Sequence, residues 1–214
     1  MQSQIDREQI GDVLQIASWW TEVSPIDVMV FSNAERVELY INDELIASQY
    51  PDELDLRHPP FTFKDVKRNF KKRERSTLTA KAYVGDELVA EQRIKAPGAP
   101  YYLSLKADFM GIPLKADGSD IVAVRCYILD SDCGVVPLTG DVHPIHFEIE
   151  GEGEIVGDAS IGANPICAEA GIATILVRST QKAGKITVRA KMYWPFNNAE
   201  RGNIRPAEIT FESI

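Results

Sequence analysis

Short runs of alternating apolar and polar residues occupy most of the chain, and they predict β-strands. In the clearest run, Ile121–Leu129, every second residue is apolar, and an Asp-Ser-Asp-Cys-Gly turn at Asp130–Gly134 ends the run. Thr77–Val84 alternates in the same way, with Thr79 expected on its polar face. Period-2 alternation between Gly and Asp turns is typical of an antiparallel sheet with one buried face. Further strands are expected at Val13–Ala17, Asp27–Phe31, Val37–Ile41, Leu45–Tyr50, Phe61–Phe63, Glu87–Ile94, Tyr101–Ala107, Ile145–Ile149, Ile172–Val177, Ile186–Met192 and Ile209–Phe211.

One proline- and glycine-rich stretch, Ala96–Pro100, interrupts this pattern and is the best candidate for a domain boundary. The pattern divides the chain into a polar leader or linker (1–12), a first sandwich (13–96), a hinge (97–100) and a second sandwich (101–214). Hardly any window shows helical spacing over ten residues. The predicted fold class is therefore all-β, with two tandem immunoglobulin-like antiparallel β-sandwiches.

The composition is that of an ordinary globular protein: 44% of the 214 residues are hydrophobic and 26% are charged. The formal net charge of −9 argues against nucleic acid or an anionic membrane as a general partner. No window approaches the roughly 18 apolar residues of a membrane span. The N-terminal residues lack an apolar signal core, so the chain by itself is expected to be soluble and not exported.

The three cysteines are too few and too scattered for a disulfide framework. Cys126 falls on the apolar face of its strand and is expected to be a small buried hydrophobe. Cys133 lies in a turn and Cys167 in an expected loop, so a bridge between these two stays open at this point.

Three groups of residues could bind ions, and each has a plainer interpretation. The basic run Lys64–Arg75 could bind anions, but a solvated loop is favoured. His143 and His146 lack the further ligands that zinc requires, so no metal site is expected there. Turn aspartates could hold calcium, but Asp also favours turns for backbone reasons alone. These aspartates are Asp117, Asp120, Asp130, Asp132 and Asp141.

The aromatic residues Trp19, Trp20 and Trp194 could form a platform that stacks against a sugar ring. The alternative is that they pack at a domain junction or against a neighbouring domain. No catalytic set is recognisable, because nucleophilic catalysis needs a Ser or Cys with a His and an orienting acid. No cofactor is expected either.

Several stretches together resemble one family. Asp27–Asn42 resembles the V-x-V-x-S-N-x-x-x-V-x-L-x-x-N pattern that occurs after the catalytic barrel in bacterial family 2 glycoside hydrolases, the β-galactosidase-like group. Lys115–Pro137 resembles the A-D-G-x-D signature of the last immunoglobulin-like domain of these enzymes. Phe147–Gly157 resembles the F-x-x-x-G-x-G-x-x-x-G continuation of that domain, and Arg205–Ser213 resembles its terminal strand. Ala159–Gly171 is shorter than the corresponding loop of the family.

The resemblance implies a fragment of a glycosidase without catalytic residues. Both catalytic glutamates of the family belong to the barrel, which has no counterpart here, so the implied partner is the barrel of a parent hydrolase. The implied roles are support of that barrel, oligomer contacts or one wall of the substrate cleft. The alternatives are an independent carbohydrate-binding module and a bacterial surface adhesion domain. The parent enzyme would be bacterial, and its cytoplasmic, periplasmic or secreted location stays open.

Overall fold

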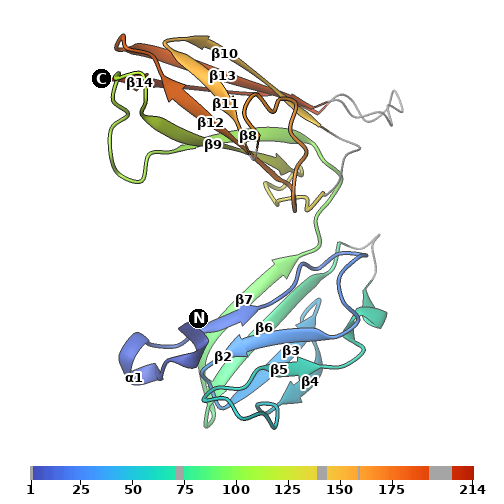
Figure 1. Ribbon diagram of the computed structural model, residues 1–214. Coiled ribbons are helices and arrows are strands. Elements are labelled where there is room, and N and C mark those ends of the chain that lie inside the picture. Colours follow the sequence, from blue (N-terminus) through green and yellow to red (C-terminus); the bar gives the residue numbers. More distant parts are fainter. Residues whose placement is uncertain (1, 71–74, 139–143, 159, 193–203) are drawn as a thin grey trace. The chain divides into compact units, whose positions relative to one another are not determined.

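The computed structural model consists mainly of antiparallel strands, which form two compact units, Met1–Pro97 and Gly98–Ile214 (Figure 1). It describes residues 2–70, 75–138, 144–158, 160–192 and 204–214. Each unit, called unit 1 and unit 2 below, contains one three-stranded and one four-stranded sheet. The all-β sandwich fold predicted from the alternation is confirmed. No helix in the described ranges is long and apolar enough to span a membrane.

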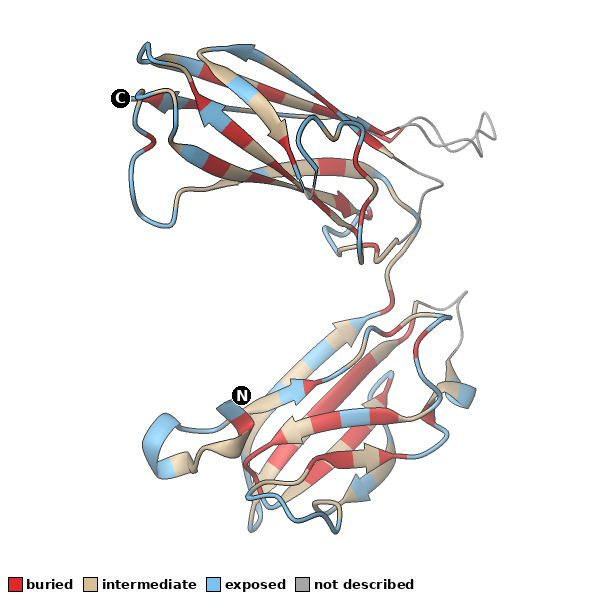
Figure 2. Cartoon of the chain, viewed as in Figure 1, coloured by how far each residue is buried: buried red, intermediate tan, exposed pale blue. Residues whose placement is uncertain are grey.

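Unit 1 is built from the sheets β1-β2-β5 and β4-β3-β6-β7, in which every strand pair is antiparallel. Side chains on one face of each sheet share a core in which Leu39, Phe61, Phe63 and Leu78 are fully buried. The alternation of buried and more open positions along β2 and β3 is visible in Figure 2. The elements of unit 1 are η1 (Gln2–Gln4), α1 (Arg7–Ile10), β1 (Leu14–Ile16), β2 (Val28–Ser32), β3 (Arg36–Ile41), β4 (Glu44–Gln49), β5 (Phe61–Phe63), η2 (Val66–Asn69), β6 (Thr77–Val84) and β7 (Glu87–Lys95).

Thr79 differs from its predicted environment. The alternation predicts a solvated face for it, but only 1% of it is exposed. The reason is its place in the sheet: β6 lies between β3 and β7, and Thr79 pairs with Tyr40 on one side and Arg93 on the other. Neighbouring side chains of this length cover a small hydroxyl residue even on the outer face of a sheet.

The polar N-terminal segment is attached to unit 1 through the side chain of Asn33. The amide nitrogen of Asn33 donates to the carbonyl oxygens of Ile5 (3.2 Å) and Gly11 (3.0 Å). Its amide oxygen accepts from the backbone nitrogen of Val13 at 2.9 Å. The short helices η1 and α1 are therefore held against the sheet. The sequence does not predict them, because four residues are too few to show a helical period.

Unit 2 is built from the sheets β10-β13-β14 and β11-β12-β9-β8. Cys126 lies among its fully buried residues, as predicted. The corner at Gly151 connects β10 to β11, a strand that the alternation does not predict. Gly151 has a φ of 97°, and a Cβ there would lie 2.0 Å from the carbonyl oxygen of Lys185, so only glycine fits. The strands of unit 2 are β8 (Tyr102–Asp108), β9 (Ile121–Leu129), β10 (Ile145–Gly151), β11 (Gly153–Gly157), β12 (Ile172–Ser179), β13 (Gly184–Met192) and β14 (Ala207–Ser213).

The carboxylate of Asp130 organises the turn after β9. Only 1% of this residue is exposed. One carboxylate oxygen accepts from the backbone nitrogens of Asp132 (2.8 Å) and Gly134 (2.9 Å), and the other accepts from Gly98 at 2.7 Å. Three backbone donors satisfy the buried charge, which would otherwise be costly. Asp130 thus ties the first residue of unit 2 to the turn at the end of β9.

Replacing Asp130 with Ala is expected to lower the free energy of unfolding of unit 2 on the order of 2–4 kcal/mol, because three backbone donors lose a charged acceptor. Chemical denaturation of the variant and of the unaltered protein measures the difference. Asp130→Asn is the matched control. It keeps one acceptor oxygen and should lose less stability than Asp130→Ala, and equal losses would contradict this account.

Candidate functional site

Trp20, one of the three predicted platform residues, belongs to the core of unit 1. Its side chain is fully buried, and its Nε1 donates to the hydroxyl of Ser76 at 3.0 Å. The ring of Phe70 meets the indole edge-on at 5.0 Å between centroids. A fully buried indole has no free face for a sugar ring, so Trp20 cannot take part in a platform in this conformation.

Trp19 is the described tryptophan that reaches solvent, with 47% of its surface exposed. Its carbonyl oxygen accepts from the hydroxyl of Ser24, which also accepts from the backbone nitrogen of Thr21 at 2.8 Å. These contacts fix the backbone and leave the ring open. Trp194 lies outside the described residues. Glycan binding at Trp19 and Trp194 therefore stays a prediction.

The turn aspartates of unit 2 are engaged with the backbone. One oxygen of Asp117 accepts from the backbone nitrogens of Ser119 (2.8 Å) and Asp120 (2.8 Å) and from the Ser119 hydroxyl (2.9 Å). These bonds hold the pKa of Asp117 below its usual value. Asp120 in turn accepts from the backbone nitrogen of Lys115 at 2.8 Å. Asp141 lies outside the described residues, and within the described ranges no three His, Cys, Asp or Glu residues are grouped to hold a metal.

The basic run is engaged locally wherever the structure describes it. Lys64 pairs with Asp27 at 2.8 Å, and Lys67 donates from Nζ to the carbonyl oxygen of Ser24 at 2.6 Å. Arg68 pairs with Asp65 at 3.0 Å. Of the remaining basic residues, those at 71–73 lie outside the described residues, and Arg75 lies half-buried in a turn. Of the histidine pair, His146 is exposed on β10, and His143 is also outside the described residues.

The structure contains no disulfide bond between Cys133 and Cys167, so the bridge that the sequence left open is not formed. The sulfur of Cys133 accepts a hydrogen bond from the hydroxyl of Tyr102 at 2.9 Å. Burial raises the pKa of the Cys126 thiol to about 12, so this cysteine stays protonated at neutral pH.

A polar cluster on the outer face of β4-β3-β6-β7 was not recognised from the sequence. Glu38 accepts from the Tyr40 hydroxyl at 2.5 Å and from Arg36. The Tyr40 hydrogen bond is the largest cause of the lowered pKa of Glu38, and the same bond raises the pKa of Tyr40. Arg36 lies 4.3 Å above the ring of Tyr83, and Lys81 lies 4.8 Å above that of Tyr40. Arg36, Glu38 and Tyr40 lie two residues apart on β3, and the pairing of β3 with β6 adds Lys81 and Tyr83 to them.

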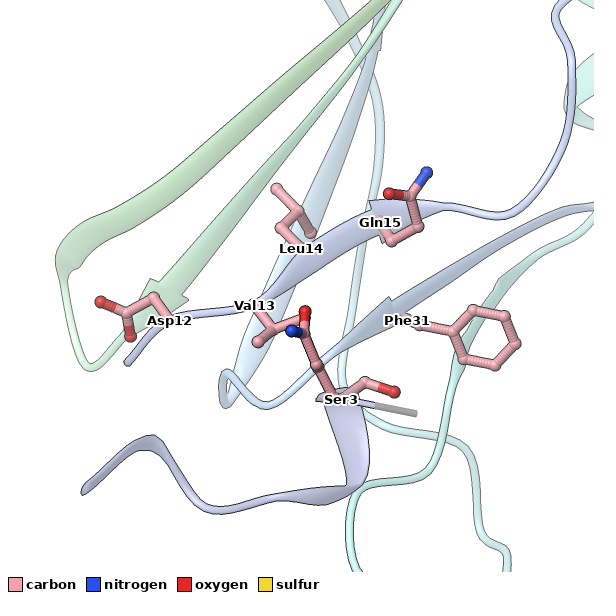
Figure 3. A pocket seen from close by; sticks show the side chains of 7 residues that line it. Ser3, Asp12, Val13, Leu14, Gln15 and Phe31 are labelled. Atoms are coloured by element: carbon pink, nitrogen blue, oxygen red, sulfur yellow. The ribbon is translucent and has the colours of Figure 1, made fainter. Parts of the chain in front are cut away.

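A pocket of about 440 Å³ lies at the N-terminal end of unit 1 (Figure 3). It contains a single carboxylate, Asp12, which pairs with Arg7. One paired carboxylate provides neither a nucleophile and base nor two facing acids, so the pocket shows no catalytic set. The residues that line it are Gln2, Ser3, Asp12, Val13, Leu14, Gln15 and Phe31.

Comparison with known proteins assigns unit 2 to a family. Residues 103–193 match the model of glycoside hydrolase family 2 C-terminal domain 5, and residues 24–90 match the domain of unknown function DUF4982. Unit 2 is therefore a C-terminal domain of the glycoside hydrolase family 2 type, and the resemblance seen in Lys115–Pro137 is confirmed.

The curated relatives are much longer than this chain. A beta-galactosidase from Thermoanaerobacter pseudethanolicus is 34% identical over 213 residues, which cover 94% of this chain and 27% of the relative. A beta-glucuronidase from Formosa agariphila is 27% identical, and the match covers 82% of this chain and 18% of the relative. The chain thus spans about a quarter or less of the length of these relatives.

Solved structures share the fold. A beta-glucuronidase from glycoside hydrolase family 2 superposes with a TM-score of 0.75 at 24% identity, covering 95% of this chain and 20% of that one. A family 2 member from Bacteroides cellulosilyticus superposes with a TM-score of 0.69 at 24% identity. The match covers 86% of this chain and 24% of that one.

The two adjacent tryptophans are expected to differ in their accessibility. Iodide should quench the emission of Trp19 and leave that of buried Trp20 unaffected, so Trp19→Phe should reduce the quenchable fraction and Trp20→Phe should increase it. Trp20→Ala should also lower the free energy of unfolding by about 3–5 kcal/mol, because it empties a large core position. Iodide titration and chemical denaturation test both statements, and a larger loss for Trp19→Ala would contradict them.

Asp117 should make unit 2 sensitive to acid. Its pKa is lowered in the folded state by the hydrogen bonds from Ser119 and Asp120. The charged carboxylate therefore contributes stability above the unfolded pKa of about 3.9, and this contribution is lost as the pH falls through the lower folded value. Asp117→Asn keeps an acceptor oxygen but does not titrate. Denaturation at a series of pH values should show a flatter acid limb for this variant, and an unchanged limb would contradict the assignment.

Proposed function

We propose that this chain is a non-catalytic accessory region of a larger family 2 glycoside hydrolase, in which a separate catalytic barrel cleaves the glycosidic bond. The observation that carries the proposal is the match of residues 103–193 to a C-terminal domain of that family. The length of the relatives supports it, because the beta-galactosidase that resembles this chain has most of its sequence outside the matched part.

The electrostatics of the acidic residues also support a non-catalytic role. Glycoside hydrolysis needs a carboxyl group whose raised pKa keeps it protonated as a general acid. Six of the described Asp and Glu residues have a pKa that is held below its ordinary value. Hydrogen bonds to basic, hydroxyl or backbone donors are the largest causes of these shifts. The residues concerned are Asp27, Glu38, Asp108, Asp117, Glu148 and Glu152.

Within the larger enzyme, the region would support the barrel, take part in oligomer contacts or form one wall of the substrate cleft. Each of these roles needs a stable surface and no chemistry of its own. Two sandwiches with well-packed cores, and with ion pairs on the outer faces of three of their four sheets, provide such a surface. The proposed partner is accordingly the catalytic barrel of the parent hydrolase.

A carbohydrate-binding module is the second candidate, and the exposed ring of Trp19 favours it. Aromatic faces bind the apolar faces of sugar rings, and Trp19 is held in place by the backbone contacts of Ser24. Titration with a broad glycan panel tests this candidate through quenching of Trp19 emission, with Trp19→Phe as the control. A flat titration would remove it.

The accessory role predicts that the purified 214-residue protein does not hydrolyse nitrophenyl β-galactoside or nitrophenyl β-glucuronide above the blank rate. The complete polypeptide encoded by the same gene should cleave at least one glycoside of this kind. Release of nitrophenol measures both. Turnover by the 214-residue protein alone would overturn the proposal, as would a gene that encodes no hydrolase domain.

A further inference from the structure

We propose that the outer face of the sheet β1-β2-β5 is the surface through which unit 1 docks against the rest of the hydrolase polypeptide. This inference rests on the proposed function and adds to it the place of contact. The face, called the docking face below, consists of Gln15, Trp19, Met29, Phe31 and Thr62.

Strand register places these residues on one side of the sheet. Gln15 pairs with Phe31, and Met29 pairs with Thr62, while Ile16, Val28, Val30, Phe61 and Phe63 point into the core. Trp19 continues the outward phase of β1, since residues 15, 17 and 19 are exposed and residues 16 and 20 are buried. Met29 is 39% exposed and Trp19 is 47% exposed. A contiguous set of large apolar side chains on one open sheet face is typical of an interaction surface.

The outer faces of the other three sheets differ from the docking face. Each of them carries ion pairs between neighbouring strands. Residues Arg189 and Glu208 lie directly opposite each other on β13 and β14, as do Arg178 and Glu154 on β12 and β11. Lys81 on β6 lies opposite Glu91 on β7. In contrast, β1, β2 and β5, all of which the structure describes, contain no charged residue. Charged side chains border their outer face instead: Lys64 pairs with Asp27 one residue beyond the Val28–Phe63 pairing, and Asp52 accepts from the hydroxyl of Thr62. Charged pairs are a common way to keep an exposed sheet soluble. A sheet face that lacks them between its edges is suited to being covered.

The surroundings extend the docking face on both sides. The 440 Å³ pocket begins at Gln15 and Phe31 and continues to Ser3 of the N-terminal segment (Figure 3). The connection between β1 and β2 presents Val23, which is 88% exposed, and Ile26, which is 58% exposed. Lys67 fixes this connection, since its Nζ donates to the carbonyl oxygen of Ser24 and its backbone nitrogen donates to that of Ile26 at 3.0 Å. A surface that is already ordered binds at a lower entropic cost.

The occupant can be inferred from the family and from the path of the chain. Because unit 2 is a C-terminal domain, the remainder of such an enzyme precedes this region in sequence. The segment that would connect to it, residues 2–12, is bound to unit 1 by Asn33 and lines the same pocket as Gln15 and Phe31. Preceding domains would therefore be tethered beside the docking face. A tethered partner has a high effective concentration, so a face of moderate size is sufficient.

Oxidative footprinting of Trp19 and Met29 tests the inference. The 214-residue protein and the complete polypeptide from the same gene are exposed to hydroxyl radicals at equal dose, and modification is measured by mass spectrometry. In the complete polypeptide, modification of both residues should fall by about fivefold or more, because interface side chains are shielded from solvent. Equal modification in the two proteins would overturn the docking inference and leave the accessory function intact.

A charge placed on the docking face provides the second measurement. In the complete polypeptide, Met29→Glu should restore Trp19 modification to the level of the 214-residue protein. Leu88→Glu is the matched control, since Leu88 is 47% exposed on β7 of the other sheet, and it should leave Trp19 protected. Circular dichroism of both variants in the 214-residue protein checks that unit 1 still folds. Restoration by both variants, or by neither, would contradict the inference.

The remaining occupants give distinct results. If the 214-residue protein forms a dimer by sedimentation velocity and Met29→Glu makes it a monomer, the face serves a second copy and the inference is overturned. If a glycan from the panel shields Trp19 in the 214-residue protein, the face binds sugar and the inference is likewise overturned. A gene without a hydrolase domain would overturn the proposed function and the inference together.

Discussion

The architecture of this protein depends on one constraint. A β-sheet has two faces, and the side chains on each face must be either buried against other groups or compatible with water. In both units one face of each sheet is buried against its partner sheet, and this burial supplies the main driving force for folding. On three sheets the outer face carries ion pairs, which are compatible with water. The fourth, β1-β2-β5, has no charged residue within its strands and carries the Asp27–Lys64 pair only at its edge, and this difference within one molecule is the basis for assigning it to an interface.

The same constraint places described acidic residues in surroundings that favour the ionised carboxylate. They lie on outer faces and in turns, where they accept hydrogen bonds from arginine, lysine and backbone donors. Asp108 bonds to Arg125, and Glu152 bonds to Lys182 and Thr180. Such bonds stabilise the ionised carboxylate and lower its pKa. A general acid requires the opposite environment, an apolar pocket that keeps the proton on the carboxyl group.

Much of the fold could be predicted from sequence, because a strand with one buried face has alternating apolar and polar residues. The bounds of β6 and β9 agree with the prediction. The pattern does not predict the register in which the strands pair. Lys81 and Tyr83 join the cluster around Glu38 and Tyr40 only when β3 pairs with β6, and long residues lie opposite the covered Thr79. The tryptophan platform could have been questioned from sequence, since adjacent residues in an extended chain point to opposite sides. Trp19 and Trp20 do so.

The three hydrogen bonds of Asn33 have a mechanical consequence. They fix residues 5, 11 and 13 to the end of β2, so the segment cannot swivel as a free tether would. A polypeptide that continues upstream of this segment would transmit rotation as well as tension directly into the sheet. The orientation of unit 1 would then depend on that of the preceding domain. One amide side chain would thereby serve as a rigid coupling, where a flexible linker would allow the two parts to turn independently.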